Sequence, residues 1–162
     1  MKKHWKASKA FASVNSAGKK VTMSKKIEID ITVPNQTKYL AVIGKIAESL
    51  AHSLGYFSDD KLELAYQLNL VLTEAMTNAI CHANECDPNK EVKVSLSVAD
   101  NQLKICVFDQ GSGFDIDALS KIEACDTDEG GRGVPIIFKL MDQVEYKKSA
   151  TGHVLEMLKF LK

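Results

Sequence analysis

Late in its longest helix-like segment, the sequence reads Thr73-Glu74-Ala75-Met76-Thr77-Asn78-Ala79-Ile80. Glu74 and Asn78 are four residues apart, so they share one face of a helix. Burying such polar groups unpaired costs about 1–3 kcal/mol each. An asparagine oxygen suits a hard cation such as Mg²⁺, and a glutamate can take a proton from a hydroxyl group or from water. The alternative is an exposed helix end with ordinary polar residues, and this motif alone does not separate the two.

The segments before this motif predict a strand followed by two helices. Residues 27–33 alternate apolar and polar side chains, which is typical of a half-buried strand. Residues 37–54 and about 58–83 carry apolar side chains at helical spacing. The second helix is the longest expected element and should lie against the sheet.

The segments after the motif predict four strands and further helical structure. Residues 92–98 and 103–107 alternate in the same way and should pair as a hairpin. A long acidic, glycine-containing loop follows over 110–133, and such loops are usually functional or mobile. The remaining expected elements are a short helix near 115–121, a helix over about 134–141, and strands over about 142–148 and 153–160.

A second motif, Asp109-Gln110-Gly111-Ser112-Gly113-Phe114, comes directly after an expected strand. The glycines allow a sharp turn and a close approach of the backbone to a ligand. Asp109 could accept a hydrogen bond from an exocyclic amine such as that of adenine. An ordinary turn at the end of a strand is the alternative, because Asp and Gly are common there.

A third motif, Gly130-Gly131-Arg132-Gly133, opens the helix expected from Val134. Free N–H groups at a helix N-terminus attract anions. Arg132 is the single arginine of the chain and is suited to forked contact with phosphate or carboxylate. The alternative is a flexible hinge before a helix.

Composition limits the class of protein. The 162 residues are 45% hydrophobic and 26% charged, which is typical of a globular protein with one domain. No apolar run approaches the roughly 18 residues of a membrane-spanning helix, so we expect no membrane span. Residues 1–26 contain eight lysines and no acid, which leaves a net charge of −8 on residues 27–162. This acidic balance argues against a general nucleic-acid binder.

We predict a basic, disordered tail over residues 1–22 and a single domain over residues 23–162. Two other interpretations of the tail are an upstream start, with Met23 as the true first residue, and an electrostatic arm for an acidic partner. The four cysteines and four histidines have no metal-ligand spacing, and we expect reduced thiols.

Taken together and in this order, the three motifs resemble the GHKL ATP-binding fold of gyrase-type ATPases, Hsp90-type chaperones and histidine kinases. Within that group the chain is most similar to the small anti-sigma factor serine/threonine kinases, over about residues 27–162. Two further stretches, Gly131–Ile137 and Leu140–Tyr146, match the same kinases. The resemblance implies a Bergerat-type α/β fold (an α+β two-layer sandwich) with a mixed or antiparallel sheet, helices on one face and a mobile ATP lid over residues 115–130.

The resemblance also implies a role for each motif. Asn78 would bind the Mg²⁺ that bridges the phosphates of ATP, and Glu74 would be the general base that activates a Ser or Thr hydroxyl. Asp109 would recognise the adenine amine within the turn. The other residues implied to contact the nucleotide are Gly111, Gly113, which would leave room for the base, and the phosphate-binding Gly131, Arg132 and Gly133.

Two departures from the family are visible. Where the family often has a Thr beside the adenine pocket, this chain has His153 in Gly152-His153-Val154-Leu155. The expected lid is acidic, so we expect modest ATP affinity that depends strongly on Mg²⁺.

The resemblance implies a cytoplasmic kinase that phosphorylates an anti-anti-sigma (STAS-type) protein and binds a sigma factor or a similar target. A homodimer is expected, with residues 27–33 as a candidate pairing edge. A nucleotide-binding interaction switch without kinase activity is the alternative function. A third possibility is a stand-alone ATPase in which Glu74 activates water.

Overall fold

The structure is a computed structural model that describes residues 26–54, 58–113 and 133–161. The N-terminal half contains β1 (Ile27–Pro34), a 3-10 turn (Thr37–Tyr39), α1 (Leu40–Ser53), α2 (Ser58–Thr77) and a π-helical turn (Asn78–Ala83). The C-terminal half contains β2 (Glu91–Ala99), β3 (Gln102–Asp109), α4 (Gly133–Leu140), β4 (Gln143–Lys148) and β5 (His153–Phe160).

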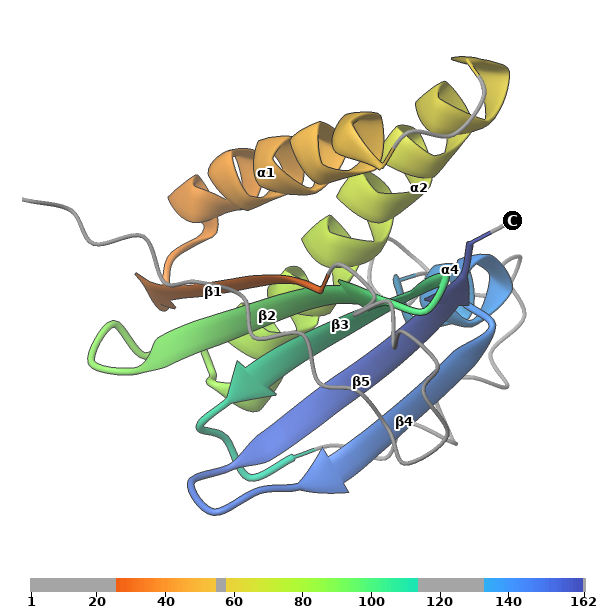
Figure 1. The fold of residues 1–162 in the computed structure, drawn as a ribbon. Coiled ribbons are helices and arrows are strands. Elements are labelled where there is room, and N and C mark those ends of the chain that lie inside the picture. The colour runs from red at the N-terminus through yellow and green to blue at the C-terminus, as the bar shows by residue number, and fades with distance from the viewer. Residues whose placement is uncertain (1–25, 55–57, 114–132, 162) are drawn as a thin grey trace, which may run out of the picture.

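The five strands form one antiparallel sheet in the order β1-β2-β3-β5-β4. Figure 1 shows α1, α2 and α4 on the same face of this sheet. The predicted two-layer fold is therefore confirmed, and of the two sheet types expected, the antiparallel one is present. β1 and β4 lie at the two edges of the sheet.

The predicted hairpin forms between β2 and β3. Ala99 pairs with Gln102, so Asp100 and Asn101 make a two-residue turn. Both turn residues have positive φ, at 49° and 58°. Positive φ at both central positions is the mark of a type I′ turn, whose twist matches that of the paired strands.

A single hydrophobic core fills the space between the helices and the sheet. The apolar side of the alternating strands faces α2, which is why residues such as Leu96, Ile105 and Met157 are almost fully buried. The helical stripe predicted for α2 supplies the other side of the core. Its buried members within α2 are Leu68, Val71, Leu72 and Ala75, and Ala79 continues the stripe in the π-helical turn.

Several predictions concern residues outside the described ranges. These are the tail over 1–22, the short helix near 115–121, the lid over 115–130, and the site residues Gly131 and Arg132. No helix in the ranges that the structure describes has the length and apolarity needed to cross a bilayer.

Candidate functional site

The first and third motifs meet where α2 ends and α4 begins. Gly133 is the first residue of α4, and a Cβ atom built on it would lie 2.5 Å from Oε2 of Glu74. The same atom would lie 3.5 Å from Nδ2 of Asn78. The structure therefore brings together three residues that the sequence places far apart, with a glycine where a side chain would crowd the carboxylate.

The helix that carries Glu74 changes its winding at Asn78. The sequence predicted a regular helix to about Ala83, but the α-helix ends at Thr77 and a π turn continues over Asn78–Ala83. The Asn84 N–H donates to the carbonyl oxygen of Ala79, five residues back, over 2.8 Å. Single π turns within helices occur frequently at functional sites.

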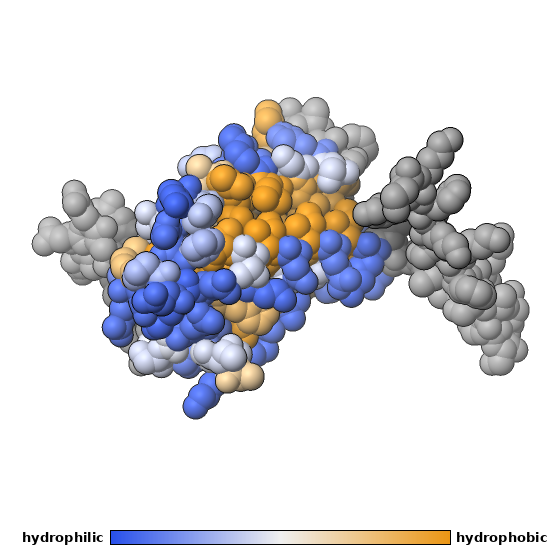
Figure 2. All heavy atoms as spheres, turned by 90° about the vertical axis from the view of Figure 1, so that its left-hand side faces the viewer, coloured by the Kyte–Doolittle hydropathy of each residue, from blue (hydrophilic) through white to orange (hydrophobic). Residues whose placement is uncertain are grey.

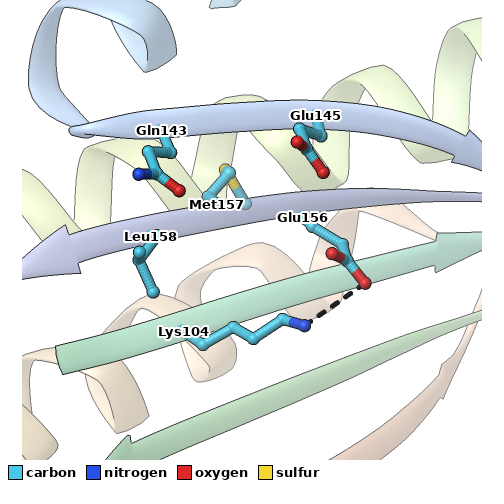
Figure 3. A pocket seen from close by; sticks show the side chains of 6 residues that line it. All are labelled: Lys104, Gln143, Glu145, Glu156, Met157 and Leu158. Atoms are coloured by element: carbon cyan, nitrogen blue, oxygen red, sulfur yellow. Dashed lines mark ion pairs between the residues drawn. The ribbon is translucent and has the colours of Figure 1, made fainter. Parts of the chain in front are cut away.

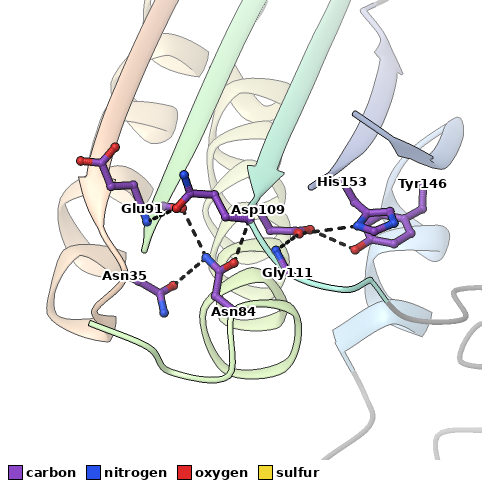
Figure 4. Close-up of polar contacts among 8 residues, drawn as sticks. Asn35, Asn84, Glu91, Asp109, Gly111, Tyr146 and His153 are labelled. Atoms are coloured by element: carbon purple, nitrogen blue, oxygen red, sulfur yellow. Dashed lines mark hydrogen bonds and ion pairs between the residues drawn. The ribbon is translucent and has the colours of Figure 1, made fainter. Parts of the chain in front are cut away.

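Asn84, directly after the π turn, links this helix to the second motif. Its side chain is fully buried, and its Oδ1 accepts a 2.8 Å hydrogen bond from the backbone N–H of Gln110. Its Nδ2 donates to Oδ1 of Asn35 at 3.0 Å and to the carbonyl oxygen of Glu91 at 3.3 Å. Figure 4 shows this network beside Asp109. We attribute the wider π turn to this arrangement, because it places Asn84 between β2 and the loop after β3.

The second motif folds tightly against the end of the π turn. The Gly111 N–H donates to Oδ1 of Asp109 at 2.9 Å, which closes the turn after β3. A Cβ atom on Gly111 would overlap the carbonyl oxygen of Ala83. A glycine is therefore required at this position by close approach of the backbone.

Asp109 is buried, with 3% of its surface exposed, and two residues of the C-terminal hairpin surround it. Tyr146 donates its phenolic O–H to Oδ2 of Asp109 over 2.9 Å. Nδ1 of His153 lies 3.9 Å from Oδ1 of Asp109, and the rings of Tyr146 and His153 stack with centroids 5.1 Å apart (Figure 4). Burial and the neighbouring Asp109 charge raise the pKa of Tyr146 above its ordinary value.

Gly113 lies against the imidazole of His153. Its φ is +86°, and a Cβ atom there would lie 2.6 Å from Cε1 of His153. From the family resemblance, Gly113 is expected to leave room for a nucleotide base. In the structure, the space beside this glycine is taken by the imidazole ring.

Two buried side-chain nitrogen atoms in the described part of the chain have no hydrogen-bond partner: Nδ2 of Asn78 and Nδ1 of His153. Buried polar atoms are nearly always paired in native proteins, so each exception requires an explanation. One of these atoms lies beside Glu74 and Gly133, and the other lies beside Asp109. Asn78 is a residue that the motifs predicted, whereas His153 lies outside the motifs and is placed by the fold beside Asp109 and Gly113.

The described part of the chain also has pockets away from these residues. One lies on the face of the sheet opposite the helices, between strands β3, β5 and β4, and an ion pair of 3.3 Å joins Lys104 and Glu156 within it (Figure 3). Within the described ranges, no group of three or more His, Cys, Asp or Glu side chains could hold a metal ion.

Residues 33–159 match the family of histidine kinase-like ATPase domains. The chain belongs to the histidine kinase-like ATPase family. The histidine kinase domain of the blue-light activated histidine kinase EL346 from Erythrobacter litoralis has the same fold. It aligns with a TM-score of 0.50 at 24% sequence identity, covering 80% of this chain and 62% of that chain.

Within the histidine kinase-like ATPases, the chain is similar to serine-protein kinases named RsbW. The protein of Halalkalibacterium halodurans (strain C-125) is 35% identical over 141 residues, which cover 82% of this chain and 83% of that protein. The protein of Bacillus subtilis (strain 168) is 32% identical, with 82% and 85% covered. The predicted similarity to anti-sigma factor kinases is confirmed at the level of the family, and these relatives support a kinase.

The residues that hold the site in place could not be predicted from the sequence. Asn84 and Asn35 are buried polar residues, but a single Asn in a sequence gives no sign of its burial. Tyr146 lies within a stretch that matched the family, and the alternation of β4 places it on the helix-facing side of the sheet. No pattern along the chain indicated that its hydroxyl group reaches Asp109.

Proposed function

We propose that this protein is a cytoplasmic bacterial anti-sigma regulatory factor with Mg-ATP-dependent serine/threonine kinase activity. Its substrate is an anti-anti-sigma protein of the STAS type, and it binds a sigma factor or a similar target. Phosphorylation of the antagonist leaves the kinase free to sequester that target. The relatives named RsbW, at about one-third identity over most of the chain, support this assignment.

The observation that carries the proposal is the position of the two unpaired buried nitrogen atoms. Nδ2 of Asn78 and Nδ1 of His153 lie at the two places where a nucleotide's phosphates and base are expected. Gly133 keeps the space beside Glu74 and Asn78 open, since any larger residue would fill it. These features fit a bound Mg-ATP. ATP would supply the phosphoryl group that is transferred, and Mg²⁺ would supply the positive charge that neutralises it.

Glu74 and Asn78, the two polar residues of the first motif, have separate roles in this proposal. Asn78 offers its side-chain oxygen as a ligand to Mg²⁺, while its Nδ2 can hydrogen-bond an oxygen of the ligand. Glu74, one helical turn earlier on the same face, accepts the proton of the attacking Ser or Thr hydroxyl group. The N-terminus of α4, beginning at Gly133, turns its free N–H groups toward the phosphates.

Asp109, Gly111 and Gly113 form the base-binding end of the site. A carboxylate that accepts hydrogen bonds from Tyr146 and Gly111 still has lone pairs for an exocyclic amine. Gly131 and Arg132 are proposed to contact the phosphates, as the family resemblance implies.

A homodimer is part of the proposal. β1 is an edge strand, and an apolar groove between it and α1 is lined by Ile27, Ile29, Val42 and Ile46. Figure 2 shows a continuous apolar area on the side of the molecule where β1 and α1 lie. Apolar areas of this kind commonly mark protein interfaces.

The first test is a thermal melt of the full chain with ATP, with and without Mg²⁺. At a hundredfold excess over Kd, binding adds about 2.7 kcal/mol, which raises Tm by roughly 5–10 °C for a chain of this size. We expect the shift to require Mg²⁺ and to vanish in Asn78→Ala. The absence of any shift at millimolar ATP would refute the nucleotide site.

The second test separates the kinase from its alternatives. Glu74→Gln should bind Mg-ATP nearly as well as the wild type but transfer no phosphate to a STAS protein. Binding by the wild type without transfer would favour the nucleotide-dependent interaction switch. Release of inorganic phosphate without an acceptor protein, lost in Glu74→Gln, would favour the stand-alone ATPase.

A further inference from the structure

We propose that His153 acts with Asp109 as a two-point reader of the adenine base, with Tyr146 as the residue that positions both. Asp109 accepts a hydrogen bond from the exocyclic amine. His153 donates from Nδ1 to the ring nitrogen next to that amine. This inference rests on the proposed nucleotide site, because it assigns the residue that distinguishes one base from another there.

The sheet holds His153 in the correct place for this role. His153 is paired directly with Asp109 across β3 and β5, so the two side chains leave the sheet on the same face. The 3.9 Å between Nδ1 and Oδ1 is too long for a hydrogen bond. Nδ1 is therefore beside the carboxylate but not bonded to it, and it has no other partner among the described residues.

Tyr146 restrains both members of the pair. Its hydroxyl group donates to Oδ2 of Asp109, and its ring stacks on the imidazole with an interplanar angle of 14°. Gly111 donates to the other carboxylate oxygen, which fixes the plane of the carboxylate. Asp109 therefore offers its acceptor oxygen atoms in one fixed orientation. Beside them, the imidazole ring of His153 offers Nδ1 as a donor.

An acceptor next to a donor matches the edge of adenine. The amine of adenine donates, and the adjacent ring nitrogen N1 accepts. The edge of guanine or hypoxanthine has the opposite order, a carbonyl oxygen next to an N–H group, and would leave both protein groups unpaired. The imidazole lies against Gly113, and the His153 side chain, 18% exposed, forms part of the surface beside the turn.

The test measures binding of ATP and of 1-deaza-ATP, in which carbon replaces N1, to the full chain with Mg²⁺ by titration calorimetry. We expect the wild type to bind ATP about tenfold more tightly than the analogue, as for one hydrogen bond. His153→Ala should bind ATP about tenfold more weakly and should no longer distinguish the two nucleotides. His153→Gln, which retains a donor, should recover part of the discrimination, and His52→Ala, an exposed histidine on α1, should change nothing.

Tyr146→Phe tests the positioning role separately. It should weaken binding of ATP several-fold and leave unchanged the binding of purine riboside triphosphate, which lacks the amine that Asp109 accepts. Equal discrimination against 1-deaza-ATP in the wild type and in His153→Ala would overturn the assignment of His153. If the wild type binds no nucleotide at all, the proposed function fails; if it binds ATP but ignores the loss of N1, only this inference fails.

Discussion

Gly133 faces Glu74 so closely that a Cβ atom on the glycine would lie 2.5 Å from Oε2 of the carboxylate. The two residues belong to different motifs, one at the end of α2 and one at the start of α4. Their approach places Glu74, the candidate general base, beside the N-terminus of α4, where anionic oxygen atoms are stabilised. The geometry therefore supports transfer of a charged group at this point.

Replacing Gly133 by Ala should impair phosphotransfer more than stability. The new methyl group has to displace the Glu74 carboxylate, and a displacement of about 1 Å can reduce the rate about a hundredfold. Phosphorylation of a STAS protein at saturating ATP measures the effect. Gly44→Ala is a matched control, because the three atoms nearest to its Cβ all belong to the side chain of Asn69, in the middle of α2. Equal activity of the two variants would contradict the proposed role of the Gly133 contact.

Gly111→Ala should instead destabilise the fold. Its Cβ would collide with the backbone oxygen of Ala83, which cannot move without disturbing the π turn. We expect a loss near the upper end of the about 1–3 kcal/mol typical of overpacking. Chemical denaturation without nucleotide measures this loss, and a stability equal to that of the wild type would show that the turn adapts.

Asn84→Ala should lower the free energy of unfolding by about 2 kcal/mol, because one buried and two partly buried hydrogen-bonding groups lose their partner. The groups affected are the N–H of Gln110, the carbonyl oxygen of Glu91 and Oδ1 of Asn35. Asn89→Ala removes an exposed hydrogen bond to Asp87 and should stay within about 0.5 kcal/mol of the wild type. Similar losses in both variants would mean that the Asn84 network contributes little.

Tyr146 should make the fold sensitive to alkaline pH. Its pKa in the folded state is raised above the ordinary value of 10.0, first by burial and then by the charge of Asp109. The folded protein keeps this proton where the unfolded chain has lost it, so the stabilisation is complete below about pH 10 and is lost as the pH rises toward the folded pKa. Tyr146→Phe should therefore show a smaller fall in Tm above pH 10. In this variant, the phenolate absorbance should also lose the component that titrates at the highest pH. Tm profiles against pH that run parallel in the wild type and the variant would contradict the prediction.

The proposed dimer predicts that Val42→Asp will produce monomers. Val42 is 56% exposed in the apolar groove between β1 and α1, and a carboxylate there would have to be buried in the interface. Leu62→Asp, at a residue on α2 that is 67% exposed and outside the groove, is the control. Sedimentation analysis measures both, and a Val42→Asp dimer as stable as the wild type would place the interface elsewhere.

Much of the fold follows from local patterns. The alternation in residues 27–33 and 92–98 predicted strands that the structure confirms as β1 and β2. The helical spacing of apolar residues likewise predicted the two helices that the structure contains as α1 and α2. The order of the strands was not predicted, because β5 lies between β3 and β4 through pairings that no local pattern encodes.

The site was predicted only in part. Glu74, Asn78 and Asp109 could be named because their motifs occur together in an order that resembles one family, although each motif alone has an ordinary structural explanation. Tyr146 and Asn84 were missed because their importance depends on partners 37 and 26 residues away, Asp109 and Gln110. The winding of the π turn was also missed, since the periodicity of apolar residues does not distinguish a helix from a local widening of it.

The π turn makes the length of this segment as important as its composition. A regular α-helix would need one residue fewer between Asn78 and Asn84 to complete the same turn. Deleting that residue would restore ordinary hydrogen bonding and would look like an improvement of the helix. Inserting a further residue would instead rotate everything beyond it by about 100° relative to Glu74, so Asn84 would no longer reach Gln110. Variants of this protein should therefore accept exchanged residues in this segment more readily than an added residue.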